Sequence, residues 1–437
     1  GGEAPDGGRL RAALAEALPD YLVPQAIVAL AALPLTAHGK LDRKALPPPG
    51  VGASAGTRPG PRDERERAVF EAWAEVLGRR DFGVEEGFFD AGGDSLRALR
   101  VLGSLRASLG LELPVRALLD GASVRSLARS IDPSSREGEH VTPLVRLSPP
   151  VAGRRAFFCA HPVTGTVSCL RPLAEALRAG GRALVAFRAP GLEPGEVPPT
   201  DLGELAAGYL AALRREQPAG PYLLGGYSLG GAVAFEMARR LEAEGERALL
   251  WLLDAPAPGA LERRGDDGAE AADGLQRLLL FVRHLGWHLE ADLRQHVARQ
   301  LDLAEGASDE ALLERLRALD DEQQLEALVA CAEAAGLAPD EGGAAYVRRL
   351  YAVHGALLGA FMCYAPGRFG GEAVQFATRA SAERAGEPTL GWGRHCARLP
   401  RTHVFDEDHA SIASTRGAAA VAPHLLAAAD VWERGDD

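Results

Sequence analysis

The stretch that decides the fold is YLLGGYSLGGAVAFEMARRL, residues 222–241. It begins with the β-type run Tyr222–Leu224 and ends in apolar residues at helical spacing, with the GxSxG motif GYSLG between them. A sharp turn between a strand and a helix strains the serine backbone, and the flanking glycines allow neighbouring chain to approach without a Cβ clash. We therefore expect the Ser228 hydroxyl to be exposed as a nucleophile.

Residues from 143 onward alternate short β-type runs with helical patterns, which is typical of a mostly parallel α/β sheet. The runs are Ala156–Cys159, Ala183–Phe187, Tyr222–Leu224, Leu249–Leu253, Ala373–Phe376 and His403–Phe405. Between Asp254 and about Tyr364 the sequence is helical and rich in leucine. We expect a helical lid, about residues 258–350, over the carboxyl edge of the sheet.

A serine hydroxyl needs a base to take its proton and a carboxylate to orient that base, in the chain order Ser, Asp, His. Asp254 ends the strand Leu249–Leu253 and is the expected carboxylate, although a turn cap is an alternative role. His409 lies in the loop FDEDHASI, after a late strand and before a final helical pattern at Ala418–Ala429, and is the expected base.

Neighbouring residues leave alternatives to both assignments. His395 and His403 are rival bases, although His403 is close to a strand end and is expected to face the other way. Asp406, Glu407 and Asp408 crowd His409, so that one of them could replace Asp254 as its orienting partner.

Two backbone N–H groups are candidates for binding a developing oxyanion. The N–H of Leu229 follows the nucleophile at the positive end of a helix. The loop HPVTG, residues 161–165, follows the first long β-type run and can offer a second N–H, that of Val163. A plain turn forced by proline and glycine is the alternative interpretation of this loop.

A stretch rich in proline and glycine, residues 47–62, and a polar stretch, residues 133–142, divide the chain into blocks 1–46, 63–132 and 143–437. The middle block is predicted to be a small four-helix-type bundle. In it, Gly92-Gly93-Asp94-Ser95 precedes a helix. Asp94 or Ser95 could simply cap that helix. Alternatively, the glycine pair leaves Ser95 exposed at the helix N-terminus, where a covalently attached phosphate would be stabilised.

Composition limits the possible partners. The 437 residues carry a formal charge of −12, the wrong sign for binding phosphate backbones, so no nucleic acid is expected. Five cysteines without CxxC spacing favour a reducing cytosol over a disulfide framework. His284 and His288 have metal-ligand spacing but lack a third ligand in register, so we expect no metal.

Other patterns are missing from the sequence. The chain has no GxGxxG pattern for a dinucleotide and no run of about 18 apolar residues, so that no membrane span is expected. It starts at Gly1 without a methionine, as a piece of a longer chain would.

Taken together, the motifs resemble the C-terminal end of a nonribosomal peptide synthetase. LPLTAHGKLDRKALP resembles the last motif of an adenylation domain, where Lys40 matches its active-site lysine. FFDAGGDSLRALRVL resembles the thiolation motif of a peptidyl carrier protein, in which Ser95 matches the serine that receives 4′-phosphopantetheine. The rest is similar to type I thioesterases, in FFCAHPVTG (oxyanion loop), GGYSLGG (nucleophile), LLDAP (acid) and VFDEDHASI (histidine). Glu407 stands where that family usually has a glycine.

The resemblance implies a multidomain protein with a small four-helix-type carrier bundle and an α/β-hydrolase fold with a helical lid insertion. It implies an adenylation-domain tail at 1–46, a carrier at 63–132 and a thioesterase at 143–437. A phosphopantetheinyl transferase would modify Ser95, and upstream synthetase modules would supply a peptidyl thioester. Ser228 would accept the peptide for release by hydrolysis or macrocyclisation. The alternative is a carrier joined to an inert α/β docking domain, whereas reductive release lacks a dinucleotide motif.

Overall fold

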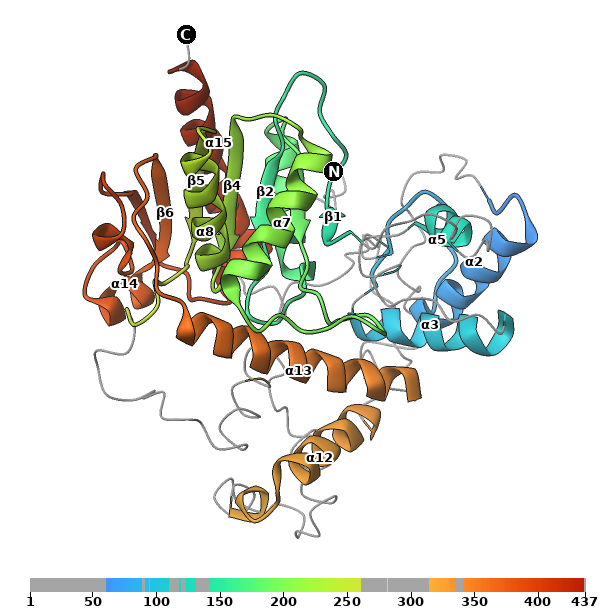
Figure 1. Ribbon diagram of the computed structural model, residues 1–437. Coiled ribbons are helices and arrows are strands. Elements are labelled where there is room, and N and C mark those ends of the chain that lie inside the picture. The colour runs from blue at the N-terminus through green and yellow to red at the C-terminus, as the bar shows by residue number, and fades with distance from the viewer. Residues whose placement is uncertain are drawn as a thin grey trace, which may run out of the picture.

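The computed structural model describes residues 60–88, 91–93, 95–109, 118, 123–130, 142–260, 281, 314–334 and 341–435. In this part of the chain a group of helices precedes a single large sheet with helices on both faces (Figure 1). The predicted adenylation tail at 1–46, with Lys40, lies outside the described residues. So do most of the linkers 47–62 and 133–142, and the lid histidines His284 and His288.

The sheet has seven strands in the order β1-β3-β2-β4-β5-β6-β7. The strands are β1 Leu144–Arg146, β2 Phe157–Ala160, β3 Leu184–Phe187, β4 Tyr222–Tyr227, β5 Ala248–Leu253, β6 Ala373–Thr378 and β7 Arg401–Phe405. All neighbouring pairs are parallel except β1 with β3. Since parallel strands present their carboxyl ends at one edge, the residues that follow β2, β4 and β5 meet there.

The predicted mostly parallel sheet is confirmed, and each of the six predicted runs overlaps one of its strands. The limits differ by up to three residues, and β4 extends to Tyr227, directly before the candidate nucleophile. The prediction missed β1, because three residues with a polar end carry no clear periodicity.

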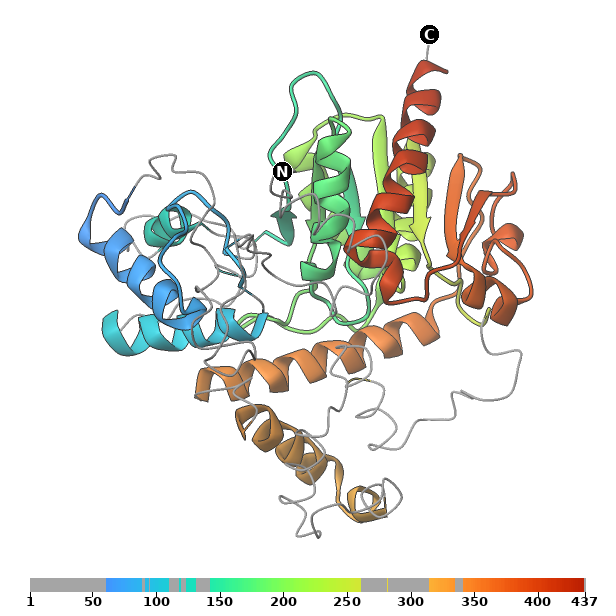
Figure 2. The same cartoon turned by 180° about the vertical axis from the view of Figure 1, so that it is seen from behind.

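Two layers of helices cover the sheet, one layer on each face (Figures 1 and 2). One face carries α7 Leu202–Glu216 and α8 Gly230–Ala243, and the opposite face carries α6 Arg171–Ala179 and α15 Thr415–Arg434. Each layer of helices packs on its face of the sheet and buries a separate apolar core. One core contains Leu224, Leu250 and Phe235, and the other contains Leu223, Trp251 and Leu425. Side chains alternate between the two faces along a strand, so a sheet covered on both sides needs a wholly apolar run.

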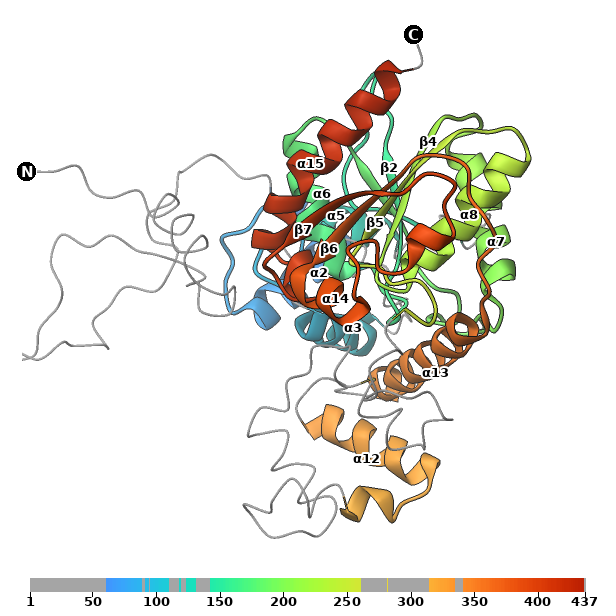
Figure 3. The same ribbon diagram turned by 90° about the vertical axis from the view of Figure 1, so that its left-hand side faces the viewer.

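Helices between β5 and β6 form the described part of the lid insertion. They are α12 Asp321–Ala334 and α13 Glu341–Cys363, which continues beyond the predicted lid limit of 350. α13 runs along the carboxyl edge of the sheet (Figure 3). Its Val353 is so close to two loop glycines that a Cβ on Gly165 or Gly191 would lie 2.8 Å from it. The lid helix therefore packs directly on the loops after β2 and β3.

The carboxyl edge is completed by a short helix and the histidine loop. α14 Arg379–Ala385 follows β6, and its first turn is capped by Thr378, whose hydroxyl accepts the N–H of Ser381. The loop after β7 leads through a turn of 3₁₀ helix, Ser411–Ala413, into α15.

The block before the sheet is helical, with α2 Glu64–Leu77, α3 Ser95–Leu109 and α5 Val124–Ser130. Asp63 caps α2 by accepting the N–H of Glu66 at 2.7 Å, and Gly78 ends the helix in the left-handed conformation. Trp73 and Phe88 are fully buried in its apolar core and meet edge to face at 4.8 Å. This block has a core of its own, as expected for an independent small domain.

Candidate active site

Ser228 occupies the sharp turn between β4 and α8, with a φ of +55° that is strained for a residue with a side chain. Its N–H donates to the carbonyl of Leu253 on the neighbouring strand, and its carbonyl accepts the N–H of Gly231. A Cβ on Gly226 would lie 2.1 Å from the backbone of Gly230. The glycine at 226 is therefore required for the helix to leave the strand so steeply, which confirms the strand–turn–helix prediction.

Gly226→Ala is expected to destabilise the fold by about 2–3 kcal/mol, because the new methyl group meets rigid backbone rather than a movable side chain. Chemical denaturation of the purified chain measures this loss. Gly208→Ala is the matched control, since Gly208 is exposed on α7 with nothing within 4 Å of an added Cβ. It should be neutral or stabilising by up to about 1 kcal/mol. Equal stability of both variants would contradict the tight-turn argument.

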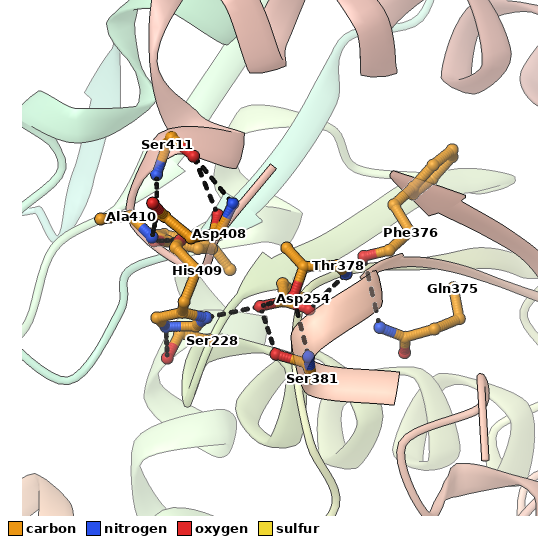
Figure 4. A network of polar contacts seen from close by, with 11 residues as sticks. Ser228, Asp254, Gln375, Phe376, Thr378, Ser381, Asp408, His409, Ala410 and Ser411 are labelled. Carbon is orange, nitrogen blue, oxygen red and sulfur yellow. Dashed lines mark hydrogen bonds and ion pairs between the residues drawn. The ribbon is translucent and has the colours of Figure 1, made fainter. Parts of the chain in front are cut away.

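Three side chains from three loops at the carboxyl edge form one hydrogen-bonded chain (Figure 4). His409 Nε2 lies 3.0 Å from Ser228 Oγ, and its Nδ1 lies 2.7 Å from Asp254 Oδ2. The structure thus brings together the serine, histidine and aspartate that the sequence predicted. In this arrangement the imidazole can accept the hydroxyl proton on one nitrogen while the carboxylate holds the proton on the other.

Asp254 is fully buried at the end of β5, and four donors reach its two carboxylate oxygens. Oδ1 accepts the N–H of Thr378 at 2.7 Å, and Oδ2 accepts the hydroxyl of Ser381 at 2.8 Å and of Thr378 at 3.3 Å as well as His409 Nδ1. Burial alone would raise the pKa of Asp254, but the hydrogen bonds and the charge of His409 outweigh it and hold this pKa below its usual value. The carboxylate therefore remains ionised inside the protein.

The acidic residues beside His409 have other partners. Asp406 pairs with Arg379 at 2.7 Å, and Glu407 lies 3.4 Å from Arg416. Asp408 accepts the N–H groups of Ala410 and Ser411 and so fixes the turn that carries His409 (Figure 4). The contact to the imidazole comes from Asp254, not from these neighbours.

The rival histidines lie elsewhere. His403 on β7 stacks on Phe376 with ring centroids 5.4 Å apart, and lies 4.6 Å from His424 of α15. His395 packs its ring against Trp392 and Phe235. The backbone of Glu407 does not have a positive φ. The turn before His409 therefore does not need the glycine that the related family usually has.

The loop after β2 lies directly against the start of α8. A Cβ on Gly230 would be 2.4 Å from the carbonyl oxygens of Ala160 and His161, so this loop and the serine turn touch through backbone. Val163 follows in the same loop, and Leu229 stands at the N-cap of α8. Within the described part of the chain, the N–H groups of Val163 and Leu229 donate to no protein acceptor. Both are therefore available to donate hydrogen bonds to an oxyanion.

His161 is fully buried at the base of this loop, where its Nδ1 lies 2.7 Å from the carbonyl oxygen of Pro162. Burial lowers the pKa of His161 from 6.5 to about 4. The folded state therefore resists protonation, and below pH 6.5 the unfolded chain gains a proton that the folded chain lacks. The contribution of His161 to the free energy of unfolding is fully present above pH 6.5 and is lost as the pH drops towards 4.

We expect the free energy of unfolding contributed by His161 to fall by about 2 kcal/mol between pH 7 and pH 5. Denaturation of wild type and His161→Gln at both pH values measures the difference, because glutamine fills similar space without titrating. The gap in stability between the two proteins should narrow or reverse at pH 5. A gap that is constant with pH would contradict the burial of a neutral histidine.

Sequence reasoning missed three residues of the site. Thr378 and Ser381 bind the carboxylate of Asp254 from more than 120 positions away, and no motif joins these segments. Tyr227 contacts the backbone and the ring of His409. Only the position of Tyr227 inside the GxSxG motif could have drawn attention to it.

In the helical block, α3 begins at Ser95, after the glycine pair. A Cβ on Gly93 would lie 2.4 Å from the ring of Phe88, so this loop is drawn tightly onto the domain core. The carbonyl of Gly92 accepts a bond from Arg97 at 2.7 Å. A fixed glycine loop leading into the N-terminus of a 15-residue helix fits a phosphodiester attached to Ser95.

A parallel sheet with a serine at a strand–helix turn, facing a histidine and an aspartate from later strands, defines an enzyme of the α/β-hydrolase type. Residues 155–428 match the thioesterase domain family, and the chain belongs to this family. Residues 67–131 match the phosphopantetheine attachment site, so the helical block is a carrier domain, a site for covalent attachment of the cofactor 4′-phosphopantetheine. Both matches confirm the predicted multidomain organisation of carrier and thioesterase.

The curated relatives of this chain include a nonribosomal peptide synthase. Malpinin synthetase of Mortierella alpina is 41% identical over 251 residues, which are 57% of this chain and 3% of that protein. The dimodular nonribosomal peptide synthase of Bacillus subtilis is 39% identical over 252 residues, 57% of this chain and 10% of that protein. The chain thus spans a small part of the length of these curated relatives.

A solved structure is similar over nearly the whole chain. The crystal structure of a holo four-domain nonribosomal peptide synthetase bound to AMP and glycine shares 26% identity at a TM-score of 0.55, covering 97% of this chain and 30% of that chain. The resemblance to the C-terminal end of such synthetases is confirmed for the carrier and thioesterase domains. Among the helices that the structure describes, none has the length and apolar character needed to cross a membrane.

Proposed function

We propose that the chain releases a finished peptide from a nonribosomal peptide synthetase, with the carrier at residues 63–132 and the thioesterase at 143–437. The observation that carries this proposal is the 3.0 Å contact between Ser228 Oγ and His409 Nε2, in a thioesterase-family domain that follows a carrier domain in the same chain. When bound to Ser95, the cofactor supplies a thiol on a flexible arm that holds the acyl chain as a thioester.

Ser228, His409 and Asp254 carry out the acyl transfer. Ser228 Oγ attacks the thioester carbonyl while His409 Nε2 takes the hydroxyl proton, and Asp254 holds the other imidazole proton at 2.7 Å. The C–S bond then breaks, and the same proton passes from His409 to the departing sulfur. The N–H groups of Val163 and Leu229 stabilise the tetrahedral oxyanion, by about 3–4 kcal/mol for each donor.

Release of the peptide repeats these steps with a new nucleophile. His409 takes a proton from water, or from an amine or hydroxyl of the peptide itself, and that group attacks the ester on Ser228. Water yields a linear acid and an internal nucleophile yields a macrocycle. Incubation with a synthetic peptidyl thioester distinguishes them, because the mass of the product differs by one water.

The remaining partners follow from the same proposal. A phosphopantetheinyl transferase modifies Ser95, and upstream synthetase modules deliver the peptide. We place the protein in the cytoplasm, because the four described cysteines (Cys159, Cys169, Cys363 and Cys396) are free thiols and suit a reducing compartment.

An active-site serine probe tests whether the α/β domain is an enzyme or an inert docking platform. A fluorophosphonate should label the wild-type chain and fail to label Ser228→Ala. Ser148→Ala is the matched control, since it removes a hydroxyl of the same domain that accepts the N–H of Leu184, away from the serine turn. Equal labelling of Ser228→Ala and wild type would remove Ser228 from the mechanism and favour the docking platform.

A further inference from the structure

The candidate base is carried on a loop and is not itself buried. The side chain of His409 is 39% exposed, in contrast to the fully buried Asp254. Asp254 restrains the imidazole at one nitrogen only, so rotation about that hydrogen bond and movement of the loop would both carry Nε2 away from Ser228. Holding this geometry requires a second restraint, because displacements of about 1 Å cost large factors in rate.

Tyr227 makes two separate contacts to His409. Its hydroxyl donates to the carbonyl oxygen of His409 at 2.5 Å, across 182 residues of sequence. Its ring stacks on the imidazole with centroids 5.2 Å apart and planes 28° apart. One contact fixes the backbone of the residue and the other limits the rotation of its side chain.

Tyr227 is itself rigidly held. It is the last residue of β4, paired in register with Leu253 of β5, and the residue is only 6% exposed. It belongs to the same apolar core as Ile412 and Ala413, which lie three and four residues after His409 in the chain. Ser228 is the next residue in the chain, so one strand end sets the position of both the nucleophile and its base.

We propose that Tyr227 is a positioning residue that keeps His409 Nε2 within reach of Ser228 Oγ. This proposal rests on the proposed function, in which His409 is the base. Two contacts of different kinds allow their contributions to be separated. Tyr227→Phe removes the hydroxyl and keeps the ring, whereas Tyr227→Leu removes both.

Steady-state release of a soluble peptidyl thioester by the full chain, measured as the sum of linear acid and macrocycle, tests the proposal. We expect Tyr227→Phe to lower kcat about tenfold and Tyr227→Leu about 100-fold, with KM changed less than about twofold. Tyr222→Phe is the matched control at the other end of β4, since its hydroxyl reaches the carbonyl of Gln217 at 3.4 Å and lies away from His409. This control should keep kcat within about twofold of wild type.

Wild-type kcat in Tyr227→Phe would overturn the proposal, as would a loss confined to KM. A loss of kcat that simply follows a lowered melting temperature, and is equal in Tyr222→Phe, would also overturn it. If wild type neither hydrolyses nor cyclises the thioester, the release function is wrong, and the rate of Ser228 labelling by a fluorophosphonate takes the place of kcat. Equal labelling rates in wild type and Tyr227→Phe then overturn the positioning role, and no labelling of wild type overturns both.

Discussion

His409→Ala is expected to lower kcat for a peptidyl thioester by at least about 10⁴-fold, because the variant lacks the imidazole that takes the proton from Ser228. His409 Nε2 is the atom that contacts the serine oxygen, at 3.0 Å. The imidazole is partly exposed, so its removal should leave the fold intact. The melting temperature and kcat of the purified variant separate these two effects.

His403→Ala is the control for this experiment. His403 lies on β7, the strand that leads into the loop of His409, where it stacks on Phe376, and the structure gives it no contact to the serine. Its kcat should stay within about threefold of wild type, as for a substitution away from the site. A small loss in His409→Ala, or a large one in His403→Ala, would show that the base has been assigned to the wrong histidine.

Asp254→Asn is expected to lower kcat about 10³- to 10⁴-fold with little change in shape. The carboxylate receives donors on both oxygens, whereas an asparagine amide has one acceptor oxygen and an NH₂ group. If the NH₂ group faces His409, Nδ1 must accept and Nε2 must carry the proton, so that Nε2 no longer receives the serine proton. If the NH₂ group faces Thr378, two donors meet and the site loses its geometry.

Asp406→Asn is the matched control and addresses the alternative in which a carboxylate next to the histidine orients it. Asp406 is exposed and pairs with Arg379 at 2.7 Å. Its replacement should change kcat less than about threefold, since an exposed ion pair contributes little. A loss in Asp406→Asn comparable with that in Asp254→Asn would move the orienting role to the histidine loop.

Most of the sheet could be predicted from the sequence, because strands buried on both faces require short, wholly apolar runs. The run ALLWLL in β5 and the run around YLL in β4 show this directly. The chain order of serine, aspartate and histidine was also predictable, since each follows a strand and parallel strands end at one edge. These inferences depend on local pattern and on a general property of parallel sheets.

The supports of the site could not be predicted in the same way. Ser381 and Thr378 bind Asp254 because β6 lies next to β5, a pairing that joins segments separated by the long lid insertion. Tyr227 reaches the carbonyl of His409 only because the loop after β7 folds back over the end of β4. Such contacts are fixed by tertiary packing, and the residue types alone carry no signal for them.

In the proposed release reaction, Ser228 accepts the acyl group held on the carrier. The full chain, loaded at Ser95 with an acylated phosphopantetheine arm, can be quenched at short times and digested, and the acyl mass located by peptide mapping. The proposed mechanism predicts that the acyl mass leaves the Ser95 fragment and appears on the fragment that contains Ser228 before free product accumulates. Free product without acylation of that fragment at any time, or acylation at another residue, would contradict it.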